Sequence, residues 1–496
     1  VHHPNGLHIL YNTSRIFTYM TDDDSQIEIK IGFFRIIKRL WPSFLIYSSF
    51  AFTLSFIFIN FLVISNIIWP GESFHSAEMG ILVGTSTYVS ALSGILFGIL
   101  ADRYSRKILM TISEIIFGFG FILIGFIIEG LGTVTYIYFL ILNLIIGFAS
   151  GGFWPIINSF GNDSTEERER SQFFGVLQAL FQLFQIIGML ISAIFFQNLF
   201  WRQFCISVGI IYILFGLIIV TKSKEPKRAS THKELSEVLL IKNVSYNYKL
   251  NKETIRSTIL SPTNIIAFVE GIFTTIMLTI PDFLFVPYIQ SEPYNISPFV
   301  TSMFMILFGL PGGLLGSLAL SKLSDKLAEE NIKNRVYLIV LSVIGLFGFY
   351  IALFFLPIPH LTVAQGNNLG LVLTYPLFWT LGVIALIARA IVGLWNINQP
   401  PILQAINLPE AQGTISSVNQ FLEAIGRGTG PIIAGTVLAM FYNNYQLTAG
   451  ITMGLGIIGG MLWLLASLWI NKDVNRISEI LKQRSVELAK NSKNEK

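Results

Sequence analysis

The stretch Gly98-Ile-Leu-Ala-Asp102-Arg103-Tyr-Ser-Arg106-Lys107 is a short charged segment that separates two long apolar runs. These runs cover approximately residues 77–101 and 107–129. In a helix that rises about 1.5 Å per residue, each run is long enough to cross the roughly 30 Å hydrocarbon core of a bilayer. A chain that crosses, turns within a few charged residues and crosses back predicts a transmembrane helical hairpin.

The composition of the whole chain extends this prediction beyond one hairpin. Of the 496 residues, 53% are hydrophobic and 12% are charged, and the mean hydropathy is +0.64. A soluble protein of this length needs more charged residues to cover its surface. Cys205 is the one cysteine, which excludes a disulfide framework and a cysteine-based metal site. We therefore expect an all-α membrane protein.

Twelve apolar windows, each bounded by polar or Gly- and Pro-rich breaks, are predicted to span the membrane. Their approximate residues are 42–69, 77–101, 107–129, 134–160, 171–196, 203–221, 263–289, 299–321, 335–356, 375–405, 413–441 and 446–470. A polar stretch divides them six and six. The predicted domains are a tail with an interfacial helix at 1–41, a six-helix bundle at 42–221, a linker at 222–262, a second six-helix bundle at 263–471 and a tail at 472–496.

The basic residues predict the orientation of these spans. All of the 33 Lys and Arg residues except Arg202, Arg389 and Arg427 fall in the tails and in loops on one side of the predicted topology. The positive-inside rule places that side in the cytoplasm. We therefore expect a multi-pass protein of the cell membrane with both termini cytoplasmic. Met20, which is followed by a threonine and three aspartates, resembles an ordinary start, so Val1–Tyr19 is expected to be an upstream extension.

The stretch at 98–107 also resembles the cytoplasmic-loop signature of the major facilitator superfamily, G-x-x-x-D-R-x-x-R-[KR]. Gly98, Asp102, Arg103, Arg106 and Lys107 match its defining positions. The resemblance implies two homologous bundles that rock against each other, so that a central site faces either side alternately. It also implies a gate latch at the cytoplasmic end. Asp102 would pair with Arg106 and meet the start of span 11, and Gly98 would let a neighbouring helix approach closely.

A weaker copy of the signature in the second half supports an internal repeat. It reads Ser321-Lys-Leu-Ser-Asp325-Lys326, with Arg335 displaced downstream, and it assigns Asp325 to the second gate. The multidrug-antiporter pattern that belongs on span 5 is absent there, whereas residues 426–435 of span 11 resemble it. This departure makes multidrug antiport a secondary hypothesis.

Ionisable side chains within the spans are the main candidates for substrate binding or ion coupling, because a charge in the bilayer needs a partner or a ligand. Arg389 in span 10 and Glu423 in span 11 fall near mid-membrane, and Arg427 follows Glu423 by one helical turn, so these two can pair. The trio forms either a structural charge network or the working core of the site, centred on Arg389 and Glu423. Glu270 in span 7 is the other carboxylate expected to face the cavity, and Glu114 in span 3 is expected to pair with a basic loop residue.

Polar and aromatic residues complete the candidate set, each of them either a wall of the cavity or a contact between helices. They are Gln178 and Gln182 of span 5, Asn158 of span 4, and Trp395 and Asn396 of span 10.

These features favour secondary transport of a small solute over catalysis. The chain has no phosphate-binding glycine loop, no H-E-x-x-H pattern and no nucleophile elbow, so we expect no enzyme, no nucleotide-driven pump, no cofactor and no metal. The favoured substrate is a polar or anionic metabolite, coupled to protons or sodium or moved by its own gradient. An exporter of amphipathic drugs or lipids and a non-transporting receptor on the same fold remain open. The protein is expected to act as a monomer in the lipid bilayer, without nucleic acid.

Overall fold

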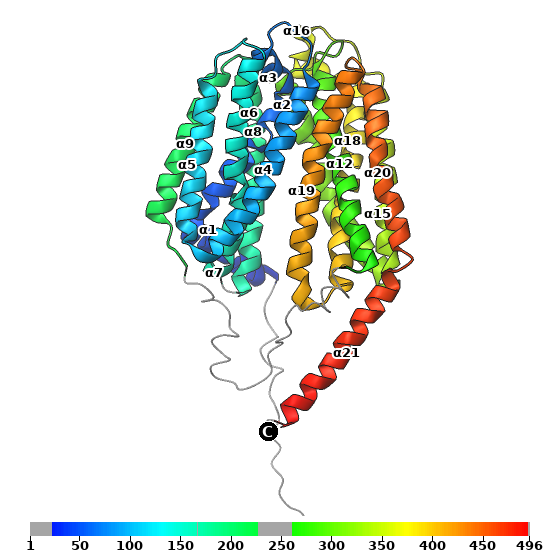
Figure 1. Ribbon diagram of the computed structural model, residues 1–496. Helices are drawn as coiled ribbons and strands as arrows, with labels where there is room; N and C mark the ends of the chain where they lie inside the picture. The colour runs from blue at the N-terminus through cyan, green and yellow to red at the C-terminus, as the bar shows by residue number, and fades with distance from the viewer. Residues whose placement is uncertain (1–21, 166, 227–259, 495–496) are drawn as a thin grey trace, which may run out of the picture.

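The computed structural model describes residues 22–165, 167–226 and 260–494. Figure 1 shows two helical bundles standing side by side, the first coloured blue to green and the second green to orange-red. The bundles supply six spans each, as predicted. The segment 1–19 and most of the linker 222–262 lie outside the described residues.

The N-terminal bundle contains two broken spans. The first span is interrupted at Ser55 and at Asn60, and the fourth at Gly152. The helices are α1 Asp22–Leu54, α2 Phe56–Ile59, α3 Phe61–Ile68, α4 Ser76–Arg103, α5 Arg106–Gly125, α6 Thr133–Gly151, α7 Phe153–Ser164, α8 Glu167–Gln197 and α9 Trp201–Lys222.

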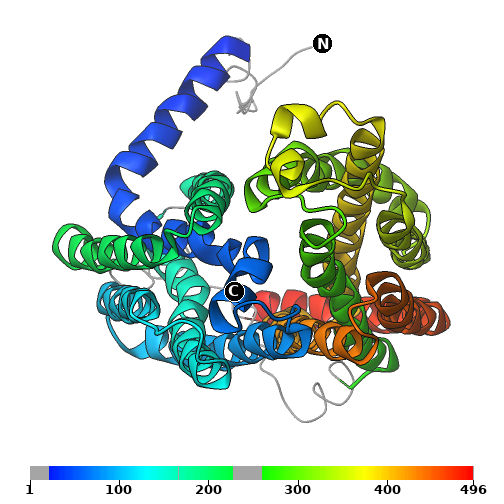
Figure 2. The ribbon, with the colours of Figure 1, turned by 90° about the horizontal axis from the view of Figure 1, so that it is seen from above.

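The helix expected at the membrane surface before the first span is continuous with that span. α1 runs from Asp22 through Pro42 to Leu54 without a break. Figure 2 shows its first turns projecting away from the bundle.

The C-terminal bundle has one broken span, in which a π-helical turn separates two α-helical pieces. Its elements are α12 Pro262–Gln290, α13 Pro298–Phe304, η2 Met305–Gly309, α14 Leu310–Glu330, α15 Lys333–Phe355, α16 Val363–Gly366, α17 Leu369–Val372, α18 Pro376–Ala405, η3 Pro409–Ala411, α19 Gln412–Met440, α20 Tyr445–Ala466 and α21 Ile470–Asn494. α21 leaves the bundle as a separate helix, as Figure 1 shows.

The eleventh span, α19, has the least apolar sequence of the twelve. Among the described residues, 11 helical segments are both long enough and apolar enough to cross a membrane. α19 is not one of them, although its 29 residues give it sufficient length. It packs against α12 of its own bundle and against α4 of the other. The span with the least apolar sequence is therefore placed where protein, and not lipid, surrounds much of it.

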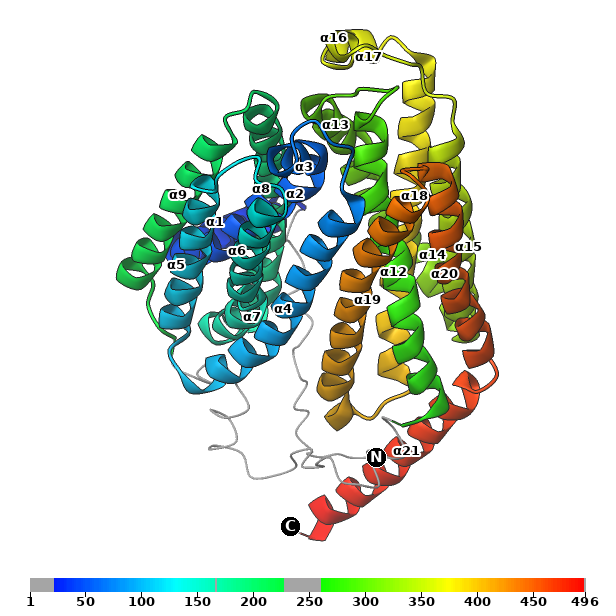
Figure 3. The same cartoon turned by 45° about the horizontal axis from the view of Figure 1, so that its top comes forward.

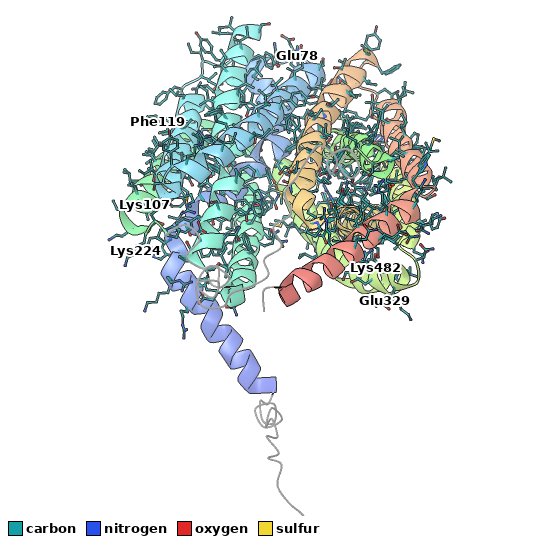
Figure 4. The ribbon with its side chains drawn as sticks, turned by 60° about the horizontal axis from the view of Figure 1, so that its bottom comes forward. Glu78, Lys107, Phe119, Lys224, Glu329 and Lys482 are labelled. Atoms are coloured by element: carbon teal, nitrogen blue, oxygen red, sulfur yellow. The ribbon has the colours of Figure 1, made fainter. Side chains whose placement is uncertain are left out.

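The molecule has two chemically distinct ends. Figure 4 shows Lys107, Lys224 and Lys482, with Glu329 among them, at one end, called the basic end below, and Glu78 at the opposite end. Figures 1 and 3 show that α4 and α19 converge toward the opposite end and diverge toward the basic end.

Close contacts join the two bundles between the opposite end and the middle of the molecule. A Cβ atom on Gly84 of α4 would overlap the backbone of Gly428 of α19, so only glycine allows this approach. The Tyr88 hydroxyl and the Thr429 hydroxyl are 2.6 Å apart.

Two further contacts close the same end from the other side. The Gln290 amide donates a 3.0 Å hydrogen bond to the Ile59 carbonyl, and the Gln197 side-chain oxygen accepts one of 3.2 Å from the Phe299 amide. The space between the bundles is therefore closed at the opposite end.

Candidate functional site

A cavity of about 610 Å³ lies between the two bundles. Its polar lining residues are Ser55, Gln182, Gln185, Asp282, Arg389, Asn396 and Arg427. The remaining lining is mostly aliphatic, with Phe58 as the one phenylalanine. Both bundles thus contribute to one space of the size that holds a small ligand.

Irregular backbone surrounds this cavity. α1 ends at Leu54, and the π-helical turn η2 forms part of the facing wall. Pro281 precedes Asp282 inside α12 and leaves a backbone carbonyl without its helical partner. Breaks of this kind in membrane helices are tolerated where they line a cavity.

Arg389 pairs with Asp282 across the cavity wall. About a third of each side chain is exposed, 32% for Arg389 and 36% for Asp282, so the pair faces the cavity. Gly312 lets α14 lie close to α18 beside this pair, because a Cβ atom there would lie 2.9 Å from the Arg389 Cβ.

This pairing corrects the expectation that Arg389 and Glu423 form one centre. α12 and α18 run in opposite directions. Residues that lie at different distances from the starts of their two helices can therefore lie at the same depth in the membrane. Asp282 lies about eight residues from the opposite end of α12 and Arg389 about 13 residues from the opposite end of α18, which leaves roughly 7 Å for the arginine side chain to bridge. Asp282 is therefore the partner that sequence reasoning missed.

Glu423 and Arg427 pair along α19, as the spacing predicts. Their closest nitrogen–oxygen distance is 3.6 Å, and the side chains are 11% and 46% exposed. Arg427 lines the cavity, whereas Glu423 lines a second, smaller pocket between α18 and α19. Arg427 therefore presents its charge to the cavity while it is only loosely tied to its carboxylate.

The second pocket has a volume of about 210 Å³. Trp395, Asn396, Gln399, Asn419 and Glu423 are among its lining residues, and Asn396 also lines the main cavity. The pocket thus lies next to the cavity, on the side of α18 and α19 that faces the basic end.

Glu270 of α12 lies behind this pocket and is fully buried. It accepts hydrogen bonds from the Thr274 hydroxyl and, at 3.3 Å, from the Trp395 indole. Glu423 accepts a 2.6 Å hydrogen bond from the Asn419 amide. Glu270 therefore lines neither space, and it contacts the wall of the small pocket through Trp395 and not the main cavity that the sequence assigns to it.

Other predicted residues lie elsewhere. Gln182 lines the cavity together with Gln185, whereas Gln178 is exposed on α8 and lines neither pocket. Asn158 accepts a 3.5 Å hydrogen bond from Asn162 within α7. Within the described ranges, no group of three or more His, Cys, Asp or Glu side chains is placed to hold a metal ion.

The prediction that Glu114 pairs with a basic loop residue is wrong. This carboxyl group is fully buried in the N-terminal bundle and accepts a 2.5 Å hydrogen bond from the Ser49 hydroxyl. α5 directs the side chain toward α1, so it does not reach a basic loop residue.

Comparison with known proteins shows the family to which the chain belongs. The sequence model of the Major Facilitator Superfamily matches residues 44–431. The chain belongs to this superfamily. Members of this transporter family are also its relatives by sequence and by structure.

Two relatives illustrate the range of the superfamily. The chain is 24% identical over 446 residues to a probable sugar efflux transporter of Helicobacter pylori (strain G27), covering 88% of this chain and 97% of that protein. It is 25% identical over 199 residues to a Na(+), Li(+), K(+)/H(+) antiporter of Planococcus maritimus, covering 40% of this chain and 44% of that protein.

Solved structures of the superfamily share the fold. A bacterial homolog to the human lysosomal transporter Spinster, in an inward-facing and unoccupied conformation, has a TM-score of 0.70 and 19% identity and covers 88% of this chain and 98% of that chain. The nucleoside transporter NupG has a TM-score of 0.58 and 16% identity and covers 89% of this chain and 98% of that chain.

The superfamily signature at the basic end forms a buried ion cluster. Arg106 is 1% exposed and pairs with Asp163 of α7 and, at 3.0 Å, with Glu225 just after α9. The Asp102 side chain, its expected partner, lies outside the described part of the chain. The cluster ties together the third, fourth and sixth spans of one bundle.

The signature glycine is not the point of closest helix contact. A Cβ atom on Gly98 would have Pro155 as its neighbour at 3.8 Å, which is ordinary contact. Gly94, one turn earlier, is tighter, because its Cβ atom would lie 3.1 Å from the Gly151 carbonyl oxygen. The neighbour in both cases is the fourth span, within the same bundle.

Glu225 also caps the start of α5. Its carboxylate accepts hydrogen bonds of 3.1 Å from the Arg106 amide, 2.9 Å from the Lys107 amide and 2.7 Å from the Ser105 hydroxyl. Partial burial by itself raises the pKa of Glu225, but these hydrogen bonds outweigh it and hold the pKa below its ordinary value. The carboxylate thus satisfies backbone donors that the first helical turn leaves unpaired.

We expect Glu225→Gln to destabilise the protein at neutral pH by about 1 kcal/mol, the usual contribution of a helix cap. Because the folded-state pKa is lowered, the contribution is fully present at neutral pH and is lost as the pH falls through the ordinary carboxyl value toward the lowered one. Thermal unfolding of both proteins from neutral to acidic pH measures this. The exposed Glu129, 3.0 Å from Arg202, provides the control, and Glu129→Gln should change little. If the unfolding temperature of Glu225→Gln stays as far below that of the wild type in acid as at neutral pH, the capping role of Glu225 is contradicted.

The second copy of the signature also forms an ion pair, in the C-terminal bundle. Arg335 pairs with Asp325 at 2.6 Å and approaches the Ser324 hydroxyl at 3.2 Å. Arg335 therefore provides the ion pair of the second signature, although it lies further along the sequence than the arginine of the first signature.

Proposed function

We propose that the protein is a secondary transporter that moves a small polar solute carrying an anionic group across the cell membrane by alternating access. The observation that carries this proposal is the cavity between the bundles, which receives two arginines from one side and two glutamines from the other. The solute crosses as the bundles rock about this cavity.

The distribution of contacts supports alternation. The bundles meet closely at the opposite end and diverge toward the basic end. With the basic end in the cytoplasm, as the positive-inside rule predicts, this arrangement is the cytoplasm-facing state, and both termini lie inside the cell. Opening the other way requires the Gly84–Gly428 approach to be released.

The charges favour an anionic group on the solute. Asp282 offsets Arg389, but Arg427 is nearly half exposed and 3.6 Å from Glu423, which itself lies outside the cavity. The cavity lining therefore carries an excess of positive charge. A planar guanidinium binds carboxylate or phosphate with two parallel hydrogen bonds.

A neutral polar solute is the second candidate. The amides of Gln182, Gln185 and Asn396 offer donors and acceptors for hydroxyl groups, and one relative is named as a probable sugar efflux transporter. A cavity built for amphipathic drugs or lipids would carry more aromatic surface than the single Phe58. A sealed receptor would lack the divergence at the basic end.

Counterflow in proteoliposomes tests the proposal with a monocarboxylate, a sugar phosphate and a neutral sugar as probes. We expect an anionic probe to exchange, and Arg427→Gln to reduce that exchange roughly tenfold or more, since a charge-assisted hydrogen bond contributes about 1.5–3 kcal/mol. Arg427→Lys should retain part of the activity, because the charge remains while the planar fork is lost. If only the neutral sugar exchanges, and neither substitution affects that exchange, the neutral polar solute is favoured and the anionic solute is contradicted.

A further inference from the structure

The pocket between α18 and α19 belongs to a cluster that is short of positive charge. Glu270 is 0% exposed and Glu423 8% exposed, and both interact electrostatically across Gly271, whose Cβ would lie 3.3 Å from Glu423 Cγ. Arg427 is the cation nearest to Glu423. With both carboxyl groups ionised, one half-exposed arginine would leave one negative charge without compensation in the interior of a membrane protein, which is costly.

The same cluster contains polar atoms without partners. Among the described residues, neither Glu270 Oε2 nor Asn419 Oδ1 has a hydrogen-bond partner, although both atoms are buried. The side-chain nitrogens of Gln399 and Trp463 lie beside the two carboxylates but outside hydrogen-bond geometry. Buried oxygen atoms that lack donors are the groups that a proton or a small cation satisfies.

Few other ionisable groups surround this pocket. Glu423 is the one ionisable residue that lines it among the residues that the structure describes. α4, which packs on the far side of α19, carries Glu78, Asp102 and Arg103 close to its two ends. The charge of the cluster is therefore set locally by Glu270, Glu423 and Arg427.

We propose that a monovalent cation, a proton or Na⁺, binds between Glu270 and Glu423 beside this pocket, separate from the solute cavity. The meaning of this binding for coupling rests on the proposed transport function. A single positive charge compensates the cluster, and Asn419 Oδ1 and Glu270 Oε2 supply the oxygens that would accept or coordinate it.

Arg427 connects the two sites. It lines the solute cavity and lies 3.6 Å from Glu423, whereas Asn396 lines both spaces. When the cation neutralises the carboxylates, Glu423 no longer holds Arg427, and the guanidinium is free for an anionic group in the cavity. Cation and solute then bind cooperatively, and the coupling is reciprocal.

Infrared difference spectroscopy of the purified full-length protein in lipid nanodiscs tests the cation site directly, without solute. The probes are protons, by titration of pH in choline chloride, and Na⁺, added at fixed pH. For a proton site, we expect a protonated carboxyl band to grow as the pH falls and to be lost or shifted in Glu270→Gln and Glu423→Gln. For a sodium site, Na⁺ should remove that band in the wild type and leave both variants unchanged.

Glu114→Gln is the matched control, because Glu114 is an equally buried carboxyl in the other bundle, held by Ser49. This variant should leave the cation response intact. A response that survives in the Glu270→Gln, Glu423→Gln double variant, or that is lost only in Glu114→Gln, would overturn the site.

Transport separates this inference from the proposed function. In proteoliposomes, Glu423→Gln should lower the ratio of accumulation driven by a proton or sodium gradient to solute counterflow by roughly tenfold or more. If counterflow and gradient-driven accumulation both match the wild type, the inferred site is not the coupling site. If the infrared response to the cation is present but none of the solute probes exchanges, the cation site is supported and the proposed transport function is contradicted.

Discussion

Arg389→Gln is expected to reduce solute exchange strongly and to destabilise the protein. Removing one partner of a buried ion pair usually costs about 3–5 kcal/mol, and partial exposure to the cavity reduces this to about 1–3 kcal/mol. Loss of a charge-assisted contact to the solute lowers exchange by roughly 30-fold to 100-fold. Counterflow in proteoliposomes and thermal unfolding in detergent measure the two effects separately.

The partner of Arg389 decides which second change rescues stability. Arg389→Gln with Asp282→Asn removes the pair as a whole and should restore the unfolding temperature while exchange stays low. Arg389→Gln with Glu423→Gln should not restore it, because Glu423 lies elsewhere. Recovery of exchange in the first double variant would show that the pair is a scaffold only, and rescue by the Glu423 change would contradict the Arg389–Asp282 pairing.

Gly84→Leu is expected to shift the protein toward the state that is open at the opposite end. The leucine side chain would overlap Gly428 and Ile432 of α19, so the bundles cannot close there. A cysteine at Gln185, in a Cys205→Ser background, reports which side reaches the cavity. Labelling from the opposite end by a membrane-impermeant thiol reagent should accelerate at least roughly tenfold, which corresponds to a shift of about 1.4 kcal/mol between the two states.

Gly454 provides the control for this change. It lies in α20, and a Cβ atom there meets nothing within 4 Å, so Gly454→Leu should leave labelling from both sides as in the wild type. Unchanged labelling in Gly84→Leu, in a protein that remains folded, would mean that the α4–α19 approach does not close the cavity.

The fold could be predicted from the sequence because its signals are local. Apolar runs bounded by breaks locate the twelve spans, and even the polar α19 is found, since its flanking breaks bracket 413–441. Within the site, Gln182 lines the cavity, and Gln185 shares its helix face because three residues are close to one 3.6-residue turn. The same period fails for Gln178, because a shared face does not specify depth, and one more turn takes this residue out of the cavity.

The partners of charged residues could not be predicted in this way. Arg389 and Asp282 are 107 positions apart, and Arg106 and Glu225 are 119 apart. Their pairing depends on how antiparallel helices are offset along their axes and on where a loop returns to its bundle. A single sequence carries no periodicity that reports either quantity, so Glu423 in the next span was the wrong choice of partner for Arg389.

The polar character of α19 also bears on how the protein is made. A segment enters the bilayer during synthesis according to its apolarity, and each charged residue near its centre adds about 2.5–3.5 kcal/mol to the cost of entry. α19 carries Glu423 and Arg427 there, so its own sequence does not retain it in lipid. α4 and α12, against which it packs, precede it in the chain and are already in place when it emerges. Biogenesis thus completes the wall between the two proposed sites only after the earlier helices have assembled a surface to receive it.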